Sequence, residues 1–289
     1  MGNEIVIPEA NSIDAPPCIV AAIGGSGTRL VANILLEHNF YLGGCFNRAL
    51  DNLWFNYLMT GVAPFSGSLE ASRRLSLFIK RMYAPAAWSA KDIQEVNSVR
   101  NALIEEGIDV DGMNNYKLPY ITLTRIPNEP ELRRPGRIGW KLPWSYLFAD
   151  EIFKLLPEAK MLFVMRNPLD LVYSRNQNQL MRFGKYFGFD SNQVSPGSRL
   201  SFYLAVFDYV LSISRKYRIS IVKFEDIIQY TEQTISEIGD FFKLNFDSNR
   251  VRALVTDPGT IGRYKKFPIH NFDNTDLSRL KKFGYEPDI

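Results

Sequence analysis

The sequence has very few of the residues that build disulfides and metal centres. Only two cysteines, Cys18 and Cys45, and two histidines, His38 and His270, occur among its 289 residues. Two such cysteines provide neither a disulfide framework nor the ligand spacing of a zinc site. Two histidines likewise argue against a histidine-based metal site. We therefore expect chemistry that needs no metal.

Long apolar runs and a strong excess of charge are also lacking. No apolar stretch is long enough to span a membrane, and the N-terminal MGNEIVIPEANSIDAPP has no basic region followed by an apolar one. The formal net charge is only +3, which is too mild to indicate nucleic-acid binding but does not repel an anionic ligand. We expect a cytoplasmic protein with no membrane span.

The residues that are present indicate an α/β protein. The hydrophobic share of 46% and the charged share of 22% are those of an ordinary globular chain. Short apolar runs alternate with segments of helical periodicity, which predicts a mostly parallel sheet between two layers of helices. We expect strands at 18–23, 137–140, 160–165 and 219–224, and helices at 28–38, 144–156, 168–180, 200–215 and 231–242.

The remaining stretches complete the expected organisation. Residues 1–17 form an N-terminal tail, and 18–289 form one domain with a helical insertion at about 45–130. Three helices are expected within 47–107, irregular chain at 108–136, a loop at 182–198 and a loop-rich basic tail after Asp257. The insertion is rich in aromatic side chains that we expect to shape an acceptor pocket or to be core: Trp54, Phe55, Tyr57, Phe78, Tyr83 and Trp88.

A glycine-rich turn follows the first expected strand and opens a helix. It reads Gly24, Gly25, Ser26, Gly27, Thr28, Arg29. Glycines let the backbone approach an anion, the helix N-terminus adds partial positive charge, and the hydroxyls and Arg29 add donors. No lysine follows Gly27, so the Gly-Lys-Ser/Thr ending of a nucleoside-triphosphate loop is absent. The turn predicts a phosphate site, against the alternative of a simple strand-to-helix connection.

A second anion clamp is predicted at the end of the 160–165 strand. There Arg166-Asn167-Pro168 turns the chain into the next expected helix, which carries Ser174 eight residues later. Carboxyl ends of parallel strands share one edge of a sheet, so Arg166 and Ser174 should face the glycine-rich turn. The forked arginine suits a phosphate. The alternative is that Arg166 pairs with Asp170 at the start of the helix.

Together the Ser-Gly-Thr turn and the Arg-Asn-Pro-x-Asp-x-x-x-Ser segment resemble the sulfotransferase family. The resemblance implies a P-loop-like fold and the donor 3′-phosphoadenosine 5′-phosphosulfate (PAPS), with 3′-phosphoadenosine 5′-phosphate (PAP) as product. It assigns the 5′-phosphosulfate to Gly24–Arg29 and the 3′-phosphate to Arg166 and Ser174. Two later segments are similar to family motifs. The first is VKFEDI at 222–227, in which Phe224 stands in place of a tyrosine. The second is GTIGRYKKF at 259–267, and its similarity implies cofactor contacts from Gly262, Arg263, Tyr264 and Lys265.

The catalytic group is predicted at the strand end that reads GWKLP. Lys141 stands where cytosolic members of the family have histidine before Leu-Pro. It could act as a base, if its pKa is lowered, or as a cation beside the leaving group. A second Lys-Leu-Pro, at Lys117, lies in the irregular stretch and has no following helix. Gly25 stands where relatives carry a cation, so Arg29 or Lys141 is expected to supply that charge.

Two other functions stay open at this stage. One is a Mg-dependent P-loop kinase of a small metabolite, and the other is a nucleotide-binding module without catalysis. The favoured acceptor is a small molecule with a hydroxyl or amine. The sequence leaves its identity and the oligomeric state open, with a homodimer as one option.

Overall fold

The computed structural model describes residues 16–83, 89–107, 137–190, 194–268 and 272–286. The chain divides into two compact units. The first contains Met1–Ile19, Leu35–Leu142 and Leu147–Ala159, and the second contains Val20–Ile34, Pro143–Tyr146 and Lys160–Ile289. Residues 1–15 of the tail expected at 1–17, the irregular stretch expected at 108–136 with Lys117, and Trp88 lie outside the described residues.

A four-stranded sheet of order β2-β1-β3-β4 organises the fold. Its strands are β1 (Cys18–Ala22), β2 (Gly139–Lys141), β3 (Lys160–Met165) and β4 (Ile219–Lys223). β3 and β4 pair in parallel, with Phe163 opposite Ile221. Every residue of β1 and β3 is buried, as expected of strands covered on both faces. The chain is therefore an α/β protein with a central sheet, as its apolar runs predict.

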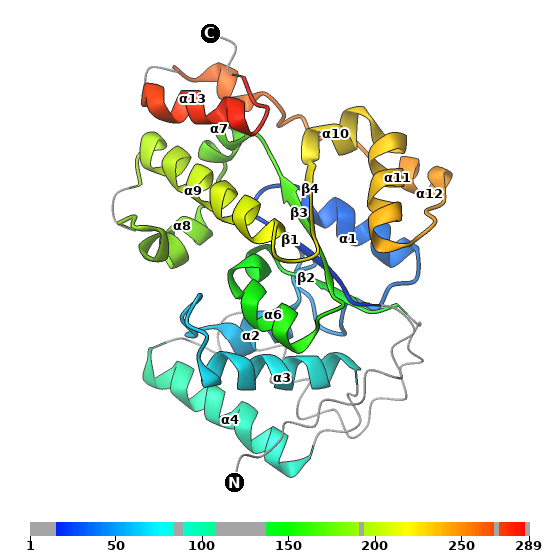
Figure 1. Cartoon of the computed structure of the whole chain (residues 1–289), viewed down its shortest axis with the longest axis vertical. Coiled ribbons are helices and arrows are strands. Elements are labelled where there is room, and N and C mark those ends of the chain that lie inside the picture. The colour runs from blue at the N-terminus through cyan, green and yellow to red at the C-terminus, as the bar shows by residue number, and fades with distance from the viewer. Residues whose placement is uncertain (1–15, 84–88, 108–136, 191–193, 269–271, 287–289) are drawn as a thin grey trace. The chain divides into compact units, whose positions relative to one another are not determined.

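The second unit holds the helices around β3 and β4. Of these, α9 contacts β4 and α11 contacts β3, and Figure 1 shows them on opposite sides of the two strands. The layered arrangement predicted from the sequence is thus present in this unit. Its helices are α1 (Thr28–Glu37), α7 (Pro168–Val172), α8 (Asn178–Phe183), η5 (Gly184–Phe187), α9 (Pro196–Ser214), α10 (Phe224–Gln229), α11 (Thr231–Phe242), α12 (Ser248–Leu254), η6 (Arg263–Lys266) and α13 (Asn274–Lys282).

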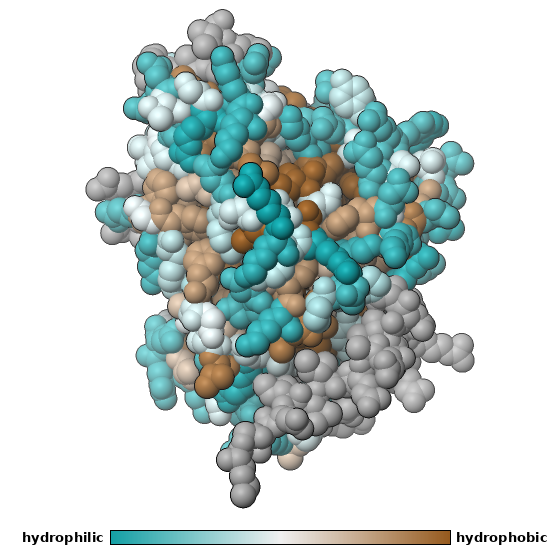
Figure 2. Space-filling view, in the orientation of Figure 1, coloured by the Kyte–Doolittle hydropathy of each residue, from teal (hydrophilic) through white to brown (hydrophobic). Residues whose placement is uncertain are grey.

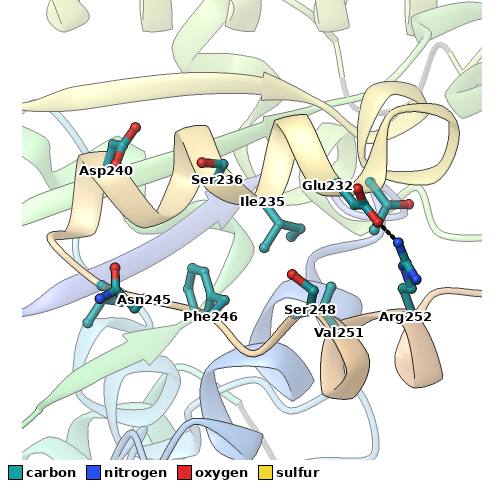
Figure 3. A pocket seen from close by; sticks show the side chains of 11 residues that line it. Glu232, Ile235, Ser236, Asp240, Asn245, Phe246, Ser248, Val251 and Arg252 are labelled. Carbon is teal, nitrogen blue, oxygen red and sulfur yellow. Dashed lines mark ion pairs between the residues drawn. The ribbon is translucent and has the colours of Figure 1, made fainter.

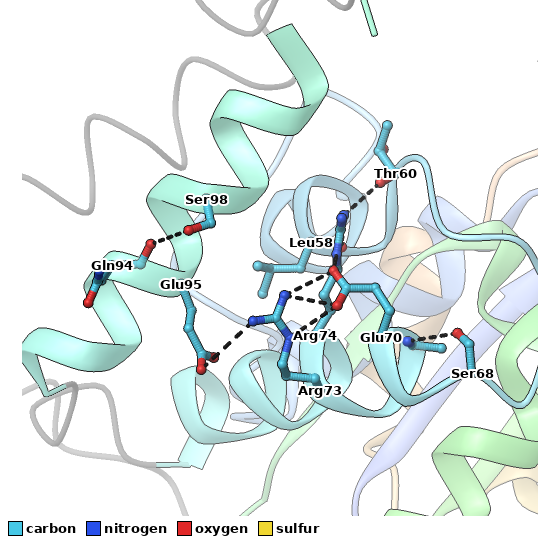
Figure 4. A network of polar contacts seen from close by, with 10 residues as sticks. Leu58, Thr60, Ser68, Glu70, Arg73, Arg74, Gln94, Glu95 and Ser98 are labelled. Carbon is cyan, nitrogen blue, oxygen red and sulfur yellow. Dashed lines mark hydrogen bonds and ion pairs between the residues drawn. The ribbon is translucent and has the colours of Figure 1, made fainter. Parts of the chain in front are cut away.

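The first unit contains α2 (Leu53–Met59), α3 (Leu69–Tyr83), α4 (Ala90–Glu105) and α6 (Ala149–Leu155). The three helices expected within 47–107 are confirmed. Arg74 of α3 donates from Nη1 to the carbonyls of Leu58 and Thr60, at 3.2 and 3.0 Å, and thereby ties α3 to the end of α2 (Figure 4). Its Nε pairs with Glu70 one turn earlier, so the buried cation is neutralised locally.

Aromatic rings form the core of the first unit rather than the wall of an open pocket. Trp54, Phe55, Tyr57 and Phe78 are each at most 1% exposed. Phe55 lies 5.1 Å from Phe78 and 6.0 Å from Trp140 between ring centroids. Burying these large apolar surfaces is the main force that holds α2 and α3 together.

Several expected boundaries are wrong, mainly where side chains replace helical hydrogen bonds. The helix expected at 144–156 is a 3-10 segment, η4 (Pro143–Phe148), followed by α6. The helix expected at 168–180 ends at Val172 and resumes at Asn178. The loop expected at 182–198 contains η5, and α9 already begins at Pro196 because Ser195 caps it. The tail after Asp257 contains η6 and α13.

Charged residues hold the C-terminal helix to the second unit. Arg279 and Lys282 of α13 both pair with Asp208 of α9. Hydrophilic residues predominate around α12 and α13 on the face shown in Figure 2.

Among the helices that the structure describes, none combines the length and apolarity needed to cross a membrane.

Candidate functional site

The glycine-rich turn joins β1 to α1 within the second unit and depends on its glycines. Gly25 and Gly27 have φ values of 93° and 83°, a region that residues with a Cβ adopt only at a cost. A Cβ on Gly27 would also overlap the ring of Phe224. On Gly24 it would lie 2.9 Å from Nδ2 of Asn176. The turn is therefore closely packed against two other segments.

The turn carries two buried hydroxyl residues, Ser26 and Thr28. Ser26 is 1% exposed and Thr28 is 5% exposed. The buried Oγ of Ser26 has no hydrogen-bond partner among the described residues. Because a buried, unpaired hydroxyl costs free energy, such a group in a packed turn indicates a ligand position. Arg29, in the first turn of α1, is exposed.

Arg166 lies beside the turn at the carboxyl end of β3. Its Nη1 donates to the carbonyl of Gly25 at 3.0 Å, and its Nη2 donates to the carbonyl and hydroxyl of Thr260 at 2.7 and 2.8 Å. The guanidinium stacks over Phe224 at 5.0 Å. Burial lowers the pKa of Arg166 from its usual value, and the nearby carboxylates of Asp170 and Glu225 oppose that shift. The side chain remains a cation, with its buried Nε unpartnered among the described residues.

Ser174 faces the same turn, although it does not lie on a helix. A Cβ on Gly25 would be 3.1 Å from its Oγ. Gln177 explains the break in the expected helix, because its Nε2 donates to the carbonyls of Leu171 and Ser174 at 3.1 and 2.7 Å. The side chain of Gln177 is held in turn by the hydroxyl of Tyr203 at 2.5 Å. The placement of Ser174 on a helix is thus wrong, but its approach to the turn agrees with the sequence prediction.

The segment with Gly262, Arg263, Tyr264 and Lys265 is joined to α7. Gly262, with φ of 74°, is the N-cap residue of η6. Its N–H and that of Tyr264 donate to the carboxylate of Asp170 at 2.8 and 3.1 Å. Asp170 thus binds these backbone groups. No direct hydrogen bond joins Arg166 to Asp170 among the described contacts, so the alternative of a pair between them at the start of the helix has no such bond to support it. Lys265 is exposed and Tyr264 is buried.

Behind Arg166, Glu225 links three segments that the sequence does not reveal as neighbours. One carboxylate oxygen accepts the N–H of Asn167 at 2.9 Å, and the other accepts the hydroxyl of Tyr285 at 3.2 Å. Burial raises the pKa of Glu225, and the Asn167 N–H opposes the shift. Phe224, the preceding residue, is 4% exposed and packs under the turn. Its observed contacts are therefore with Gly27 and Arg166.

Lys141 belongs to the first unit, and its ammonium is engaged there. The residue is 2% exposed at the end of β2. Its Nζ donates to the carbonyl of Ala49 at 2.9 Å and pairs with the carboxylate of Asp51. Asn47 supports this arrangement by donating to the other oxygen of Asp51 at 2.8 Å. The side-chain nitrogen of Lys141 is therefore engaged by two oxygen acceptors of the first unit.

The second unit therefore gathers the predicted phosphate contacts, together with residues that sequence reasoning missed. Thr260, Asp170, Gln177, Glu225 and Asn176 support the cluster: Thr260 accepts from Arg166, Asn176 lies beside Gly24, and the other three bind backbone groups. Asp170, Glu225 and Thr260 belong to segments that the sequence singles out, but these supporting contacts leave no local pattern. A cleft of about 330 Å³ between α11 and α12 contains none of the predicted residues (Figure 3). Within the described residues, no group of three or more His, Cys, Asp or Glu side chains could hold a metal ion.

Comparison with known proteins identifies the family to which the chain is similar and proteins of similar fold. A family model described as the sulfotransferase family matches residues 17–248. The sulfotransferase domain of the Synechococcus PCC 7002 olefin synthase has a similar fold, with a TM-score of 0.52, 16% identity, and coverage of 94% of this chain and 95% of that one. A Mycobacterium avium sulfotransferase gives a TM-score of 0.46 at 12% identity over 95% of this chain and 78% of that one. No curated protein matches the sequence significantly.

Proposed function

Because the chain belongs to the sulfotransferase family, we propose that it transfers the sulfuryl group of PAPS to a hydroxyl or amine of a small-molecule acceptor. The observation that carries the proposal is the cluster in the second unit. There the glycine-rich turn, Arg166 and Ser174 converge, and a buried Ser26 hydroxyl has no partner in the described chain. PAPS supplies a sulfuryl group attached to a phosphate leaving group, so the protein's task is binding, orientation and charge stabilisation.

The residues present fit the two phosphate-bearing ends of such a nucleotide. The turn offers backbone N–H groups, the positive end of α1 and the Ser26 and Thr28 hydroxyls, which suit the 5′ end. Arg166 offers a fork of donors beside the Ser174 hydroxyl, which suits the 3′-phosphate. In this role Arg166 exchanges the carbonyls of Gly25 and Thr260 for phosphate oxygens. We assign further contacts to Gly262, Arg263, Tyr264 and Lys265, and the support of Arg166 to Phe224.

We propose that Lys141 acts as a cation rather than as a base. The hydrogen bond to Ala49 and the ion pair with Asp51 both stabilise the protonated ammonium. A protonated Lys141 could neutralise negative charge that develops during transfer. Arg29, exposed in the first turn of α1, is the second candidate for that role.

Calorimetric titration with PAP tests the nucleotide site without requiring an acceptor. The wild-type chain should bind PAP at micromolar concentration, and Arg166→Ala should weaken binding about 30-fold, or about 2 kcal/mol for a lost charge-assisted contact. Arg252→Ala is the matched control, because Arg252 lines the α11–α12 cleft and should leave the affinity unchanged. Absence of PAP binding by the wild type would refute the proposal. Normal binding by Arg166→Ala would refute the 3′-phosphate assignment.

The same titration distinguishes the alternatives left open by the sequence. Tight binding of Mg-ATP with transfer of its terminal phosphate would favour a kinase, although no lysine follows Gly27. Binding of PAP without sulfuryl transfer to any acceptor would favour a binding module. A mass-spectrometric screen of acceptor classes, reading the gain of one sulfuryl group, tests the proposed small-molecule acceptor.

We also propose that the enzyme acts in the cytoplasm and needs no metal. Cys18 and Cys45 are buried free thiols, which fits a reducing compartment. Activity that persists in a chelator would support the metal-free reaction.

A further inference from the structure

A buried carboxylate that the proposed phosphate contacts do not use lies in the first turn of α7. Asp170 is 1% exposed. Its two oxygens accept hydrogen bonds from the N–H groups of Gly262 and Tyr264, which lie 92 and 94 positions further along the chain. The burial of a carboxylate is costly unless strong donors replace water. These two N–H groups therefore replace the water that the buried carboxylate of Asp170 has lost.

The carboxylate also supplies a cap that η6 lacks locally. Gly262 occupies the N-cap position with φ of 74°, and no side chain of its own caps this 3-10 helix. The first N–H groups of a helix have no partner within it and need an external acceptor. Asp170 provides that acceptor from a different element. The pair of bonds therefore orders the start of η6, where Arg263 and Lys265 stand.

Other contacts hold the ends of the same segment. Thr260 accepts from the cationic Arg166 before η6, and Arg263 donates to the carbonyl of Tyr173 at 3.4 Å. After η6, the ring of Phe267 stacks on Tyr173 with centroids 3.8 Å apart. Asp170 supplies the carboxylate that binds backbone N–H groups between these points, at the start of η6.

We infer that Asp170 is a positioning residue that fixes residues 260–265 against α7 and so holds Arg263 and Lys265 in place for the nucleotide. The role of Arg263 and Lys265 toward the nucleotide rests on the proposed function. The contact of Asp170 with residues 260–265 does not depend on that function. Asp170→Asn is the informative change, because it keeps the size of the side chain but replaces one acceptor oxygen with a donor facing an N–H group.

Limited proteolysis with trypsin measures the anchoring directly. Lys265 and Lys266 are exposed cleavage positions. In Asp170→Asn, cleavage there should be at least about tenfold faster than in the wild type, since local opening governs the rate. Asp226→Asn is the matched control, because Asp226 occupies the first turn of α10 and its substitution should leave the rate unchanged. An unchanged rate in Asp170→Asn would overturn the inference.

A double-mutant cycle in PAP binding separates positioning from general destabilisation. Lys265→Ala should weaken PAP binding in the wild type but have little further effect in the Asp170→Asn background, because the segment is then already displaced. Equal effects of Lys265→Ala in both backgrounds would contradict a role through this segment. If the wild type fails to bind PAP, the proposed function falls, but proteolysis still decides whether Asp170 anchors the segment.

Hydrogen exchange on the wild-type chain tests the contact even if Asp170→Asn does not fold. The amides of Gly262 and Tyr264 should be protected about tenfold or more relative to that of exposed Gly259, whose N–H bonds only to neighbouring Asp257. Exchange of both amides at the rate of Gly259 would overturn the inference.

Discussion

Gly27 should be the least replaceable residue of the glycine-rich turn, and the effect of replacing it can be divided into three parts. Its φ of 83° costs a residue with a Cβ about 1–2 kcal/mol. Alanine also reduces the freedom of the unfolded chain, which returns about 0.4–1 kcal/mol. Overlap of the new Cβ with the buried ring of Phe224 should add about 1–3 kcal/mol, the usual cost of overpacking. We expect Gly27→Ala to lose about 1–5 kcal/mol of unfolding free energy, the sum of these ranges.

Gly188 provides a matched control because its φ is 80° and nothing lies within 4 Å of the position that a Cβ would take there. Gly188→Ala should therefore lose only the backbone contribution, about 1 kcal/mol or less. Urea denaturation followed by intrinsic fluorescence measures both variants. In a Phe224→Ala background the loss from Gly27→Ala should fall to the value for Gly188→Ala. Equal losses from Gly27→Ala and Gly188→Ala in the wild-type background would refute this reasoning.

Two further predictions concern ionised side chains. Lys141→Met should lower kcat about 10²–10³-fold. Lys141→Arg should recover part of this loss, because arginine keeps the positive charge but cannot act as a base. If Lys141→Arg is as inactive as Lys141→Met, the base role is favoured instead. Burial raises the folded-state pKa of Glu225 above its usual value of 4.5. The contribution of Glu225 to the free energy of unfolding therefore declines as the pH rises above 4.5. The stability deficit of Glu225→Gln should therefore be larger at pH 4 than at pH 7.5 in urea titrations, and a deficit that grows with pH would contradict the assigned shift.

Apolar runs and periodicity predicted the main elements well because burial dominates those segments. The run KMLFVM at 160–165 coincides with β3, and the helix expected at 231–242 coincides with α11. Fully buried strands carry a short continuous apolar run, whose length and flanking turn residues distinguish it from a buried helix. The predicted approach of Ser174 to Gly25 also follows from topology alone, since parallel strands bring their carboxyl ends to one edge.

The missed features depend on side chains that replace backbone hydrogen bonds. Gln177 interrupts the expected helix by bonding to three carbonyls of the preceding turn, and a glutamine at that spacing is compatible with an uninterrupted helix. Asp170 and Gly262 meet across 92 positions, which no local pattern records. The engagement of Lys141 by Asp51 likewise depends on how the chain from Asn47 folds back. These contacts arise from tertiary structure, so propensity cannot predict them.

The bonding of Arg166 bears on how a phosphate would be recognised in the proposed role. Its Nη atoms already donate to Gly25 and Thr260, whereas its buried Nε has no partner among the described residues. A phosphate held as we propose would gain the bond from Nε outright but would have to displace Thr260 from Nη2. The energy gained at Nη2 is the difference between a charged and a neutral acceptor, which is smaller than the full strength of the new bond. Release of Thr260 would thus accompany binding, and the strength of its hold on Arg166 would tune the affinity.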